Sequence, residues 1–340
     1  MQVGSSRIGD TTPGVGRREW MAGMLAAFVL SSSSRADDLP AKKADPVTDE
    51  DREIEAVLAA GSQAHLPAFK MSKSANYLAI GDASTTFREL TLKDCEAVSA
   101  DYLDYYKSLG FDVQRPKHRL IIVTLSDERA FYSFVFPNEK PLPKRPGPPP
   151  QVHGLYNRDN NRLIVYDHHA LGPQFGPRPG YQNLRTIAHE ATHQLTFNTG
   201  LLQRKGDVPV CIIEGLAMYG EVRKFNGRTP PGEKNAQRLT DLATQQRAKI
   251  PWVPVPDLLS DDAHVRPPAR ESLLSYAESW LLVDLLMKDP KRLPALRAYL
   301  SAIRTRKDSV NRLHDAREHL GDLDALDQAL RAYALKRLKA

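Results

Sequence analysis

The sequence predicts an α+β fold, with a small mixed sheet in the N-terminal half and a mostly helical half after it. Three observations support this prediction. Apolar runs with strand character, "ANYLAIGD" (75–82), "RLIIVTLS" (119–126) and "NRLIVYD" (161–167), alternate with helical patterns. From about residue 181 onward the apolar residues recur with helical spacing, broken at prolines and glycines. No internal repeat interrupts this order.

Two helical patterns and one long loop complete the N-terminal half. "TLKDCEAVSADYLDYYKSLG" begins with a capping pattern at Thr91 and Asp94 and stops at Gly110, so we expect a helix there. "DERAFYSFVF" (127–136) predicts a short helix. Seven prolines in the segment 137–151 rule out regular structure and predict a surface loop.

The second half is expected to be built from helices. The predicted ranges are 181–197, 210–225, 233–248, 271–288, 291–304 and 322–338. We therefore divide the chain into an α/β subdomain at 61–170 and a helical subdomain at 171–340. The strand at 161–167 is expected to be the edge strand of the first subdomain.

Residues 1–36 are expected to be a signal peptide. Arg17 and Arg18 precede an apolar stretch from Met21 to Leu30, and Ser34 and Ala36 supply the small residues of a cleavage site. The arginine pair resembles a twin-arginine signal; an ordinary Sec signal or a disordered tail are the alternatives. Residues 37–60 predict a polar linker leading into a first short helix. We expect an exported bacterial protein, periplasmic or extracellular.

Composition excludes several classes of protein. The formal charge of +6 is spread along the chain, and the one dense basic cluster is a C-terminal tail, so we expect no nucleic-acid partner. No apolar run is long enough to form a stable membrane span. Cys95 and Cys211 match no disulfide framework or zinc–thiolate spacing; two buried free thiols are expected, with a single bridge as the alternative.

The stretch "TIAHEATHQL" (186–195) carries the strongest chemical signal. Residues four apart on a helix lie on one face, so His189 and His193 can bind one ion, and imidazole nitrogens suit zinc. Glu190 is turned about 100° from His189, which places it beside the ion as a general base. The alternative is an amphipathic helix with two surface histidines.

A catalytic zinc needs a third protein ligand and an open position. Glu214 in "VCIIEGLAMYGE" (210–221) is the best candidate, because an unpaired carboxylate after an apolar run is costly to bury. The alternative is that Glu214 is only a helix-start residue. The pair His168-His169 and the single His264 are weaker candidates, since none of them has helical ligand spacing.

HExxH followed by apolar-Glu-Gly-x-Ala-x-Tyr resembles the gluzincin zinc metallopeptidases, and is most similar to an uncharacterised group of exported bacterial peptidase-like domains. The resemblance implies a zincin-like helical half, His189, His193 and Glu214 as ligands of Zn²⁺, and Glu190 as the base. Tyr276 in "YAESWL" matches the family's oxyanion-stabilising tyrosine; the alternative is a core aromatic residue. Tyr219 and Glu221 are candidates for orienting a histidine ligand. The segment that binds a free amine in aminopeptidases is absent from the sequence.

These observations predict an exported zinc-dependent peptidase that acts on peptide or protein substrates. Two other readings stay open: a zinc-containing binding or scaffold protein without activity, and a zinc hydrolase of a non-peptide bond. The sequence does not determine the cleavage specificity or the oligomeric state.

Overall fold

A five-stranded mixed sheet organises the N-terminal half of the computed structural model, which describes residues 48–137, 152–171, 179–225, 227–265 and 272–339. The strand order is β1 (Lys70–Lys73), β2 (Tyr77–Gly81), β3 (Leu120–Leu125), β5 (Arg162–Tyr166) and β4 (Gly154–Asn157). The three central strands are parallel, and the two edge strands are antiparallel to their neighbours. The central strands are buried throughout, which explains their continuous apolar sequences.

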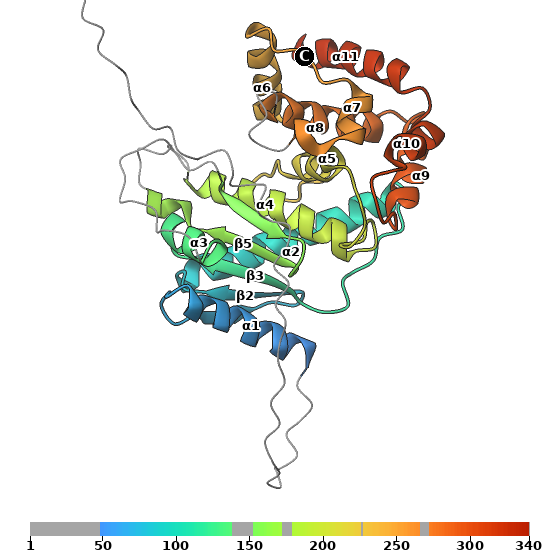
Figure 1. The fold of residues 1–340 in the computed structure, drawn as a ribbon. Coiled ribbons are helices and arrows are strands. Elements are labelled where there is room, and N and C mark those ends of the chain that lie inside the picture. Colours follow the sequence, from blue (N-terminus) through green and yellow to red (C-terminus); the bar gives the residue numbers. More distant parts are fainter. Residues whose placement is uncertain (1–47, 138–151, 172–178, 226, 266–271, 340) are drawn as a thin grey trace, which may run out of the picture.

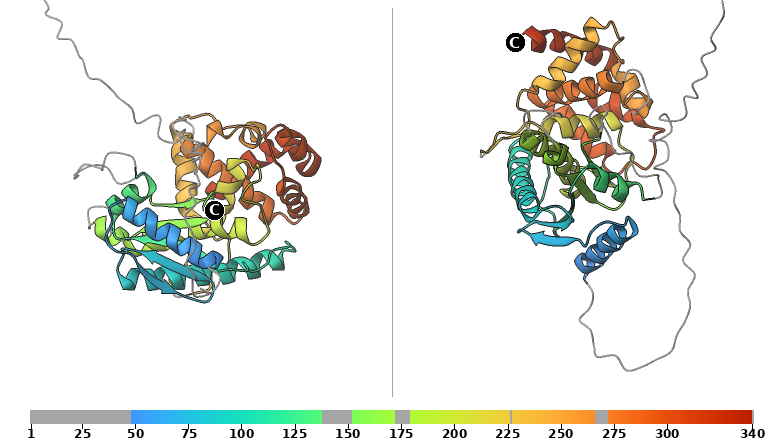
Figure 2. Two further views of the ribbon diagram at one scale, coloured as in Figure 1. Left: turned by 60° about the horizontal axis from the view of Figure 1, so that its bottom comes forward. Right: turned by 90° about the vertical axis from the view of Figure 1, so that its left-hand side faces the viewer.

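Helices cover both faces of this sheet (Figure 1). One face packs on α1 (Asp49–Gln63) and α3 (Glu128–Val135). The other face packs on α2 (Thr85–Ser108) and α4 (Pro179–Asn198). The remaining helices lie beyond α4, on the side away from α1, as Figure 2 shows. They are α5 (Val210–Gly220), α6 (Ala236–Arg247), α7 (Val255–Ser260), α8 (Ser272–Lys288), α9 (Leu293–Ile303), α10 (Arg312–Leu320) and α11 (Leu323–Lys339).

The architecture is α+β, as predicted from the sequence. One apolar cluster runs from the sheet through α2 and α4 into α5, α8 and α11. The boundary drawn at residue 170 therefore separates two sequence patterns that share a core. No helix among the described residues is long and apolar enough to cross a bilayer.

Several elements depart from the expected layout. α1 begins at Asp49, inside the predicted linker, because Thr48 and Asp51 form a reciprocal capping box. α2 begins at Thr85 rather than Thr91, because Ser84 accepts a hydrogen bond from the Phe87 amide. α5 ends at Gly220, earlier than expected, and α7, α10, β1 and β4 were not foreseen. The predicted signal peptide and most of the proline-rich loop lie outside the described residues.

The prediction that the strand 161–167 forms the edge was wrong. β5 is flanked by β3 on one side and by β4 on the other, so β4 is the edge strand. Asn157 accepts hydrogen bonds from the amides of Asp159 and Asn160, which closes the turn that folds β4 back onto β5. The four-residue strand "GLYN" directly follows the proline-rich segment and is too short to show a period.

Candidate metal centre

Helix α4 presents two histidines on one side while its other side is fixed in the core. Ile187, Ala188, Ala191 and Leu195 are buried against the sheet and α2. His189 and His193 lie one turn apart, and their rings meet edge to face with centroids 4.8 Å apart. The packing of the apolar side thus determines the direction in which both imidazoles point.

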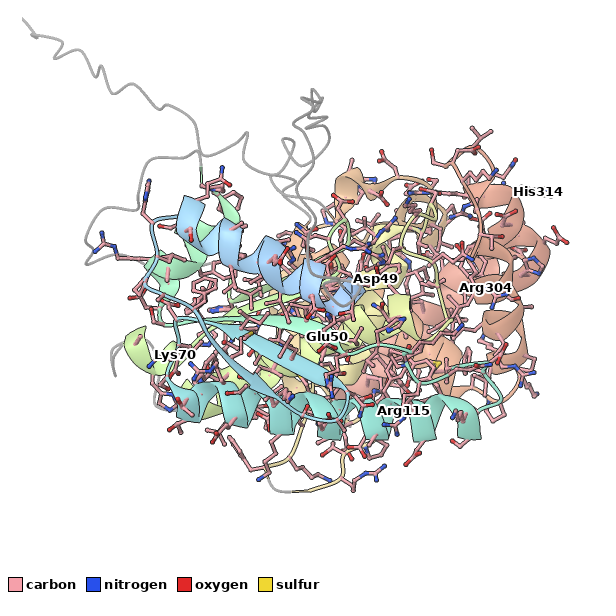
Figure 3. The ribbon with its side chains drawn as sticks, turned by 90° about the horizontal axis from the view of Figure 1, so that it is seen from below. Asp49, Glu50, Lys70, Arg115, Arg304 and His314 are labelled. Atoms are coloured by element: carbon pink, nitrogen blue, oxygen red, sulfur yellow. The ribbon has the colours of Figure 1, made fainter. Side chains whose placement is uncertain are left out.

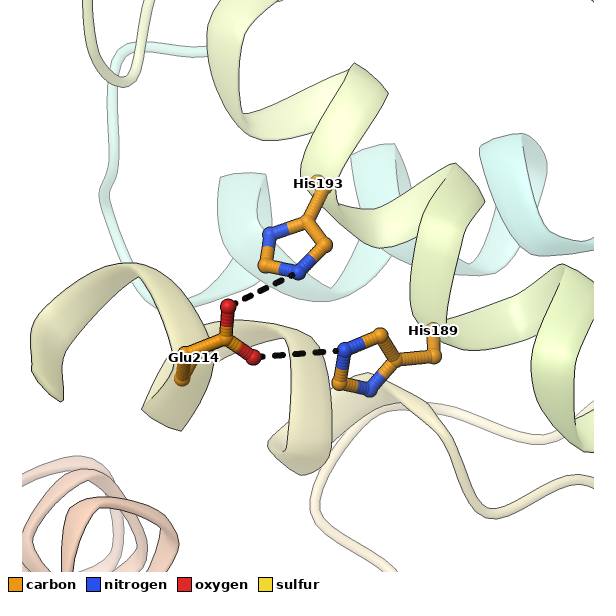
Figure 4. A group of neighbouring side chains, drawn as sticks. All are labelled: His189, His193 and Glu214. Atoms are coloured by element: carbon orange, nitrogen blue, oxygen red, sulfur yellow. Dashed lines mark ion pairs between the residues drawn. The ribbon is translucent and has the colours of Figure 1, made fainter. Parts of the chain in front are cut away.

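Helix α5 brings Glu214 to these two histidines. Its carboxylate oxygens lie 3.4 Å from Nε2 of His189 and 3.6 Å from Nε2 of His193 (Figure 4). Gly215 allows α5 to approach α8 closely, because a Cβ atom there would lie 2.5 Å from the Ser279 carbonyl oxygen. The glycine next to Glu214 therefore helps to set the position of α5.

Two of the three donor separations are close to those around a tetrahedral metal ion. One ligand atom from each of the three residues lies within 4.8 Å of the others. Two ligands each about 2.0–2.1 Å from zinc at the tetrahedral angle are about 3.3–3.4 Å apart. The distances from Glu214 to the two histidines are close to that value. Two imidazoles and one carboxylate are also the donors that zinc accepts in proteins.

The charges in this cluster are strongly coupled. Burial alone would raise the pKa of Glu214, but the adjacent imidazoles hold it well below its usual range. Burial would likewise lower the pKa of His189, but hydrogen bonds to Glu214 and Glu221 raise it to about 10. Glu214 is therefore an anion at neutral pH, as a metal ligand must be.

Glu221 lies behind His189, on the ring edge away from Glu214. Its Oε2 is 3.0 Å from Nδ1 of His189 and, as a carboxylate oxygen, can only accept, so Nδ1 carries the hydrogen. This contact leaves Nε2 of His189 directed toward Glu214. Glu221 is 2 % exposed, and its charge is balanced by Arg185 and Arg238.

From the sequence, Glu221 and Tyr219 were both candidates to orient a histidine. In the structure only Glu221 contacts one. Tyr219 bonds to the hydroxyl of Tyr105 at 2.6 Å instead. The arginines that hold Glu221 were missed. Arg185 lies one turn before His189 on α4 and could have been found by helical spacing, whereas Arg238 comes from α6 and has no such signal.

Glu190 lies beneath the edge strand β4. It is 8 % exposed, and burial raises its pKa, while the charges of His189 and His193 act in the opposite direction. A Cβ atom on Gly154 would lie 3.1 Å from Cγ of Glu190, and the backbone N–H of Tyr156 also faces the carboxylate. The strand therefore rests directly on the glutamate.

Tyr276 is placed by α8 near the same cluster. The negative charge of Glu214 is the largest influence that raises the pKa of its hydroxyl, followed by burial and by the charge of Glu190. The hydroxyl is therefore within electrostatic reach of both carboxylates. Its side chain also packs partly against the apolar core.

The weaker metal-ligand candidates lie elsewhere. His168 bonds to Asn183 and to His153, and His169 bonds to Asp167. His264 lies in a short 3-10 helix at Asp262–His264. Among the described residues, the only group of three or more suitable donors is His189, His193 and Glu214. Cys95 and Cys211 are both free and buried, as expected.

Comparison with known protein families gives a match over part of the chain. Residues 183–309 match a family model described as "Protein of unknown function (DUF1570)". The matched segment runs from α4 past α9 and contains every residue of the candidate centre. No curated protein matches the chain.

Proposed function

We propose that this chain is a zinc-dependent peptidase. The observation that supports it is the convergence of His189, His193 and Glu214, with Glu190 next to the first ligand on the same helix. A zinc ion held by these three residues would act as a Lewis acid, polarising a substrate carbonyl and acidifying water. The resemblance to gluzincins supports the same assignment.

The side chains around the centre have distinct roles in this proposal. Glu190 accepts the proton of the attacking water and delivers it to the leaving amine. Its burial beneath β4 raises its proton affinity, which suits both steps. Tyr276 donates a hydrogen bond to the oxyanion as the carbonyl becomes tetrahedral. Glu221 orients His189 through Nδ1.

Strand β4 favours an extended polypeptide as the substrate. It is the outermost strand of the sheet among the described residues, and it lies over the glutamate that would act as base. A peptide that adds to this edge forms main-chain hydrogen bonds and exposes its carbonyl groups to the centre. A non-peptide substrate would make no use of this edge.

A purely structural metal site is less well supported. Such a site closes the coordination shell with a fourth protein ligand. The described residues provide three donors in this group. A buried carboxylate such as Glu190, adjacent to a ligand but outside the group, also has no role in a structural site.

The proposal is tested by replacing the base alone. Glu190→Gln should retain one zinc ion per chain and lose about 100-fold or more of the hydrolysis of a denatured protein mixture. Zinc content by atomic spectroscopy and release of new amino groups measure the two properties. Unchanged hydrolysis in this variant would exclude the mechanism, and activity on small esters alone would exclude a peptidase.

Export by the N-terminal segment is also proposed. The arginine pair at Arg17 and Arg18, the apolar stretch and the small residues before Asp37 support it. Replacing both arginines by lysine should block export if the twin-arginine route is used, and should leave it intact if the Sec route is used.

A further inference from the structure

A cavity away from the candidate metal centre lies where the ends of two helices meet the side of a third. Its volume is about 340 Å³, within the range of small-molecule sites. Its walls come from the residues after α2, the residues after α4, and one side of α9. It shares no residue with the metal centre.

Two arginines dominate the polar lining. Arg297 lies on α9. Arg304, which is labelled in Figure 3, is the C-cap residue of that helix. Each donates one hydrogen bond to a main-chain carbonyl: Arg297 to Leu109 and Arg304 to Gly200, both at 3.3 Å. Neither guanidinium forms an ion pair with a described residue, and Nε of Arg304 has no partner there. Most of their ten N–H donors are thus available to a ligand.

The rest of the lining limits the chemistry of that ligand. Phe111, Leu201 and Leu300 provide a buried apolar floor. The carbonyl ends of α2 and α4 and the carboxylate of Asp112 add negative potential near the arginines. A singly charged, planar oxyanion is therefore favoured over a dianion.

We propose that this cavity binds a small carboxylate attached to an apolar group. The guanidiniums receive the carboxylate through charge-assisted hydrogen bonds, and the apolar group covers the floor. Gly110 makes the geometry possible: its φ is 77°, and a Cβ atom there would lie 2.6 Å from Nη1 of Arg297. Because Gly200 follows the helix that carries His193, the ligand would also contact the end of α4.

The test uses the full chain and measures binding directly by calorimetry or by ligand-observed NMR. N-acetyl-leucine is the probe, N-acetyl-leucinamide is the uncharged control, and inorganic phosphate represents dianions. We expect N-acetyl-leucine to bind with a dissociation constant of about 1–10 mM, as its size predicts, and more weakly in high salt. The amide and phosphate should bind at least about tenfold more weakly.

Three variants test whether N-acetyl-leucine binds in this cavity. Arg304→Gln should weaken the binding of N-acetyl-leucine about tenfold or more. Ser301→Leu, which adds a bulky side chain to the cavity wall and leaves both arginines in place, should weaken binding about tenfold or more without loss of stability. Arg292→Gln is the matched control, because Arg292 pairs with Asp289 and does not line the cavity.

Several results would overturn the assignment. They are no saturable binding of the carboxylate at tens of millimolar, equal binding of the amide, tighter binding of phosphate, or binding that Ser301→Leu leaves unchanged. Each of these readouts is independent of metal and of hydrolysis.

Discussion

The carboxylate of Glu221 lies 3.0 Å from Nδ1 of His189, on the ring edge that faces away from Glu214. It connects the candidate metal centre to a buried charge network with Arg185 and Arg238. Through it, Arg185 in the second turn of α4 and Arg238 in the first turn of α6 contribute to the orientation of one histidine.

Replacing this carboxylate should weaken metal binding without removing a ligand. Glu221→Gln keeps the shape but loses the charge that holds Nδ1 and balances two arginines. We expect zinc affinity to fall about 10–100-fold, measured by competition with a fluorescent chelator. Glu233→Gln removes a carboxylate that pairs at the surface with Lys224 and should have no effect. Equal affinities in the two variants would contradict the role of Glu221.

Strand β4 should tolerate no side chain at Gly154. A Cβ atom there would lie 2.6 Å from Cγ2 of Thr186 and 3.1 Å from Cγ of Glu190, so Gly154→Ala displaces either the strand or the base. We expect hydrolysis to fall about tenfold or more while zinc content is retained.

The clash itself can be tested by relieving part of it. Adding Thr186→Ser removes the closer methyl group and should restore part of the activity. Gly227→Ala is the control, since a Cβ atom there has nothing within 4 Å. Normal activity in Gly154→Ala would show that contact between β4 and Glu190 does not matter for the reaction.

The hydroxyl of Tyr276 should act on turnover rather than on substrate affinity. Tyr276→Phe removes a donor that is used only as charge develops, so kcat should fall about 100-fold with KM nearly unchanged. Tyr219→Phe removes the hydroxyl that bonds to Tyr105 and serves as the matched control. If both variants keep full activity, Tyr276 is a core aromatic residue.

Glu278 should make stability depend on pH. Burial raises its pKa to about 8, and its carboxyl group accepts from the Val253 amide. The folded state therefore retains a proton that the unfolded state releases near its ordinary pKa of 4.5. Stability due to this group is complete below that pKa and is lost as the pH rises toward about 8.

The neutral variant isolates this effect. Glu278→Gln should unfold like the wild type at pH 4.5 and be more stable by roughly 2–5 kcal/mol at pH 9, measured by urea unfolding. A difference that does not change with pH would contradict the assigned titration.

Local signals predicted most of the fold, because buried parallel strands and amphipathic helices have distinct patterns. Where the prediction failed, the cause was nonlocal or too short to read. The Thr91/Asp94 pattern lies inside α2, because Ser84 caps the helix two turns earlier and Phe87 in the first turn is buried in the core. β4 is defined by its pairing with β5 rather than by its own four residues.

The residues of the candidate centre could also be predicted only as far as local sequence signals define them. His189, Glu190 and His193 follow from helix geometry alone. Glu214 required an argument about the cost of burial, and its position beside the histidines depends on how α5 packs against α4 and α8. Arg238 was not predicted, because only the tertiary fold brings α6 to Glu221.

The most direct measurement is the metal content of the purified chain. We expect one zinc ion per wild-type chain, and loss of that ion, or at least about 100-fold weaker binding, in His193→Ala and in Glu214→Ala. His264→Ala should retain the full amount. A wild-type chain that holds no zinc after supplementation, or variants that bind it as tightly as the wild type, would show that His189, His193 and Glu214 do not form a zinc site.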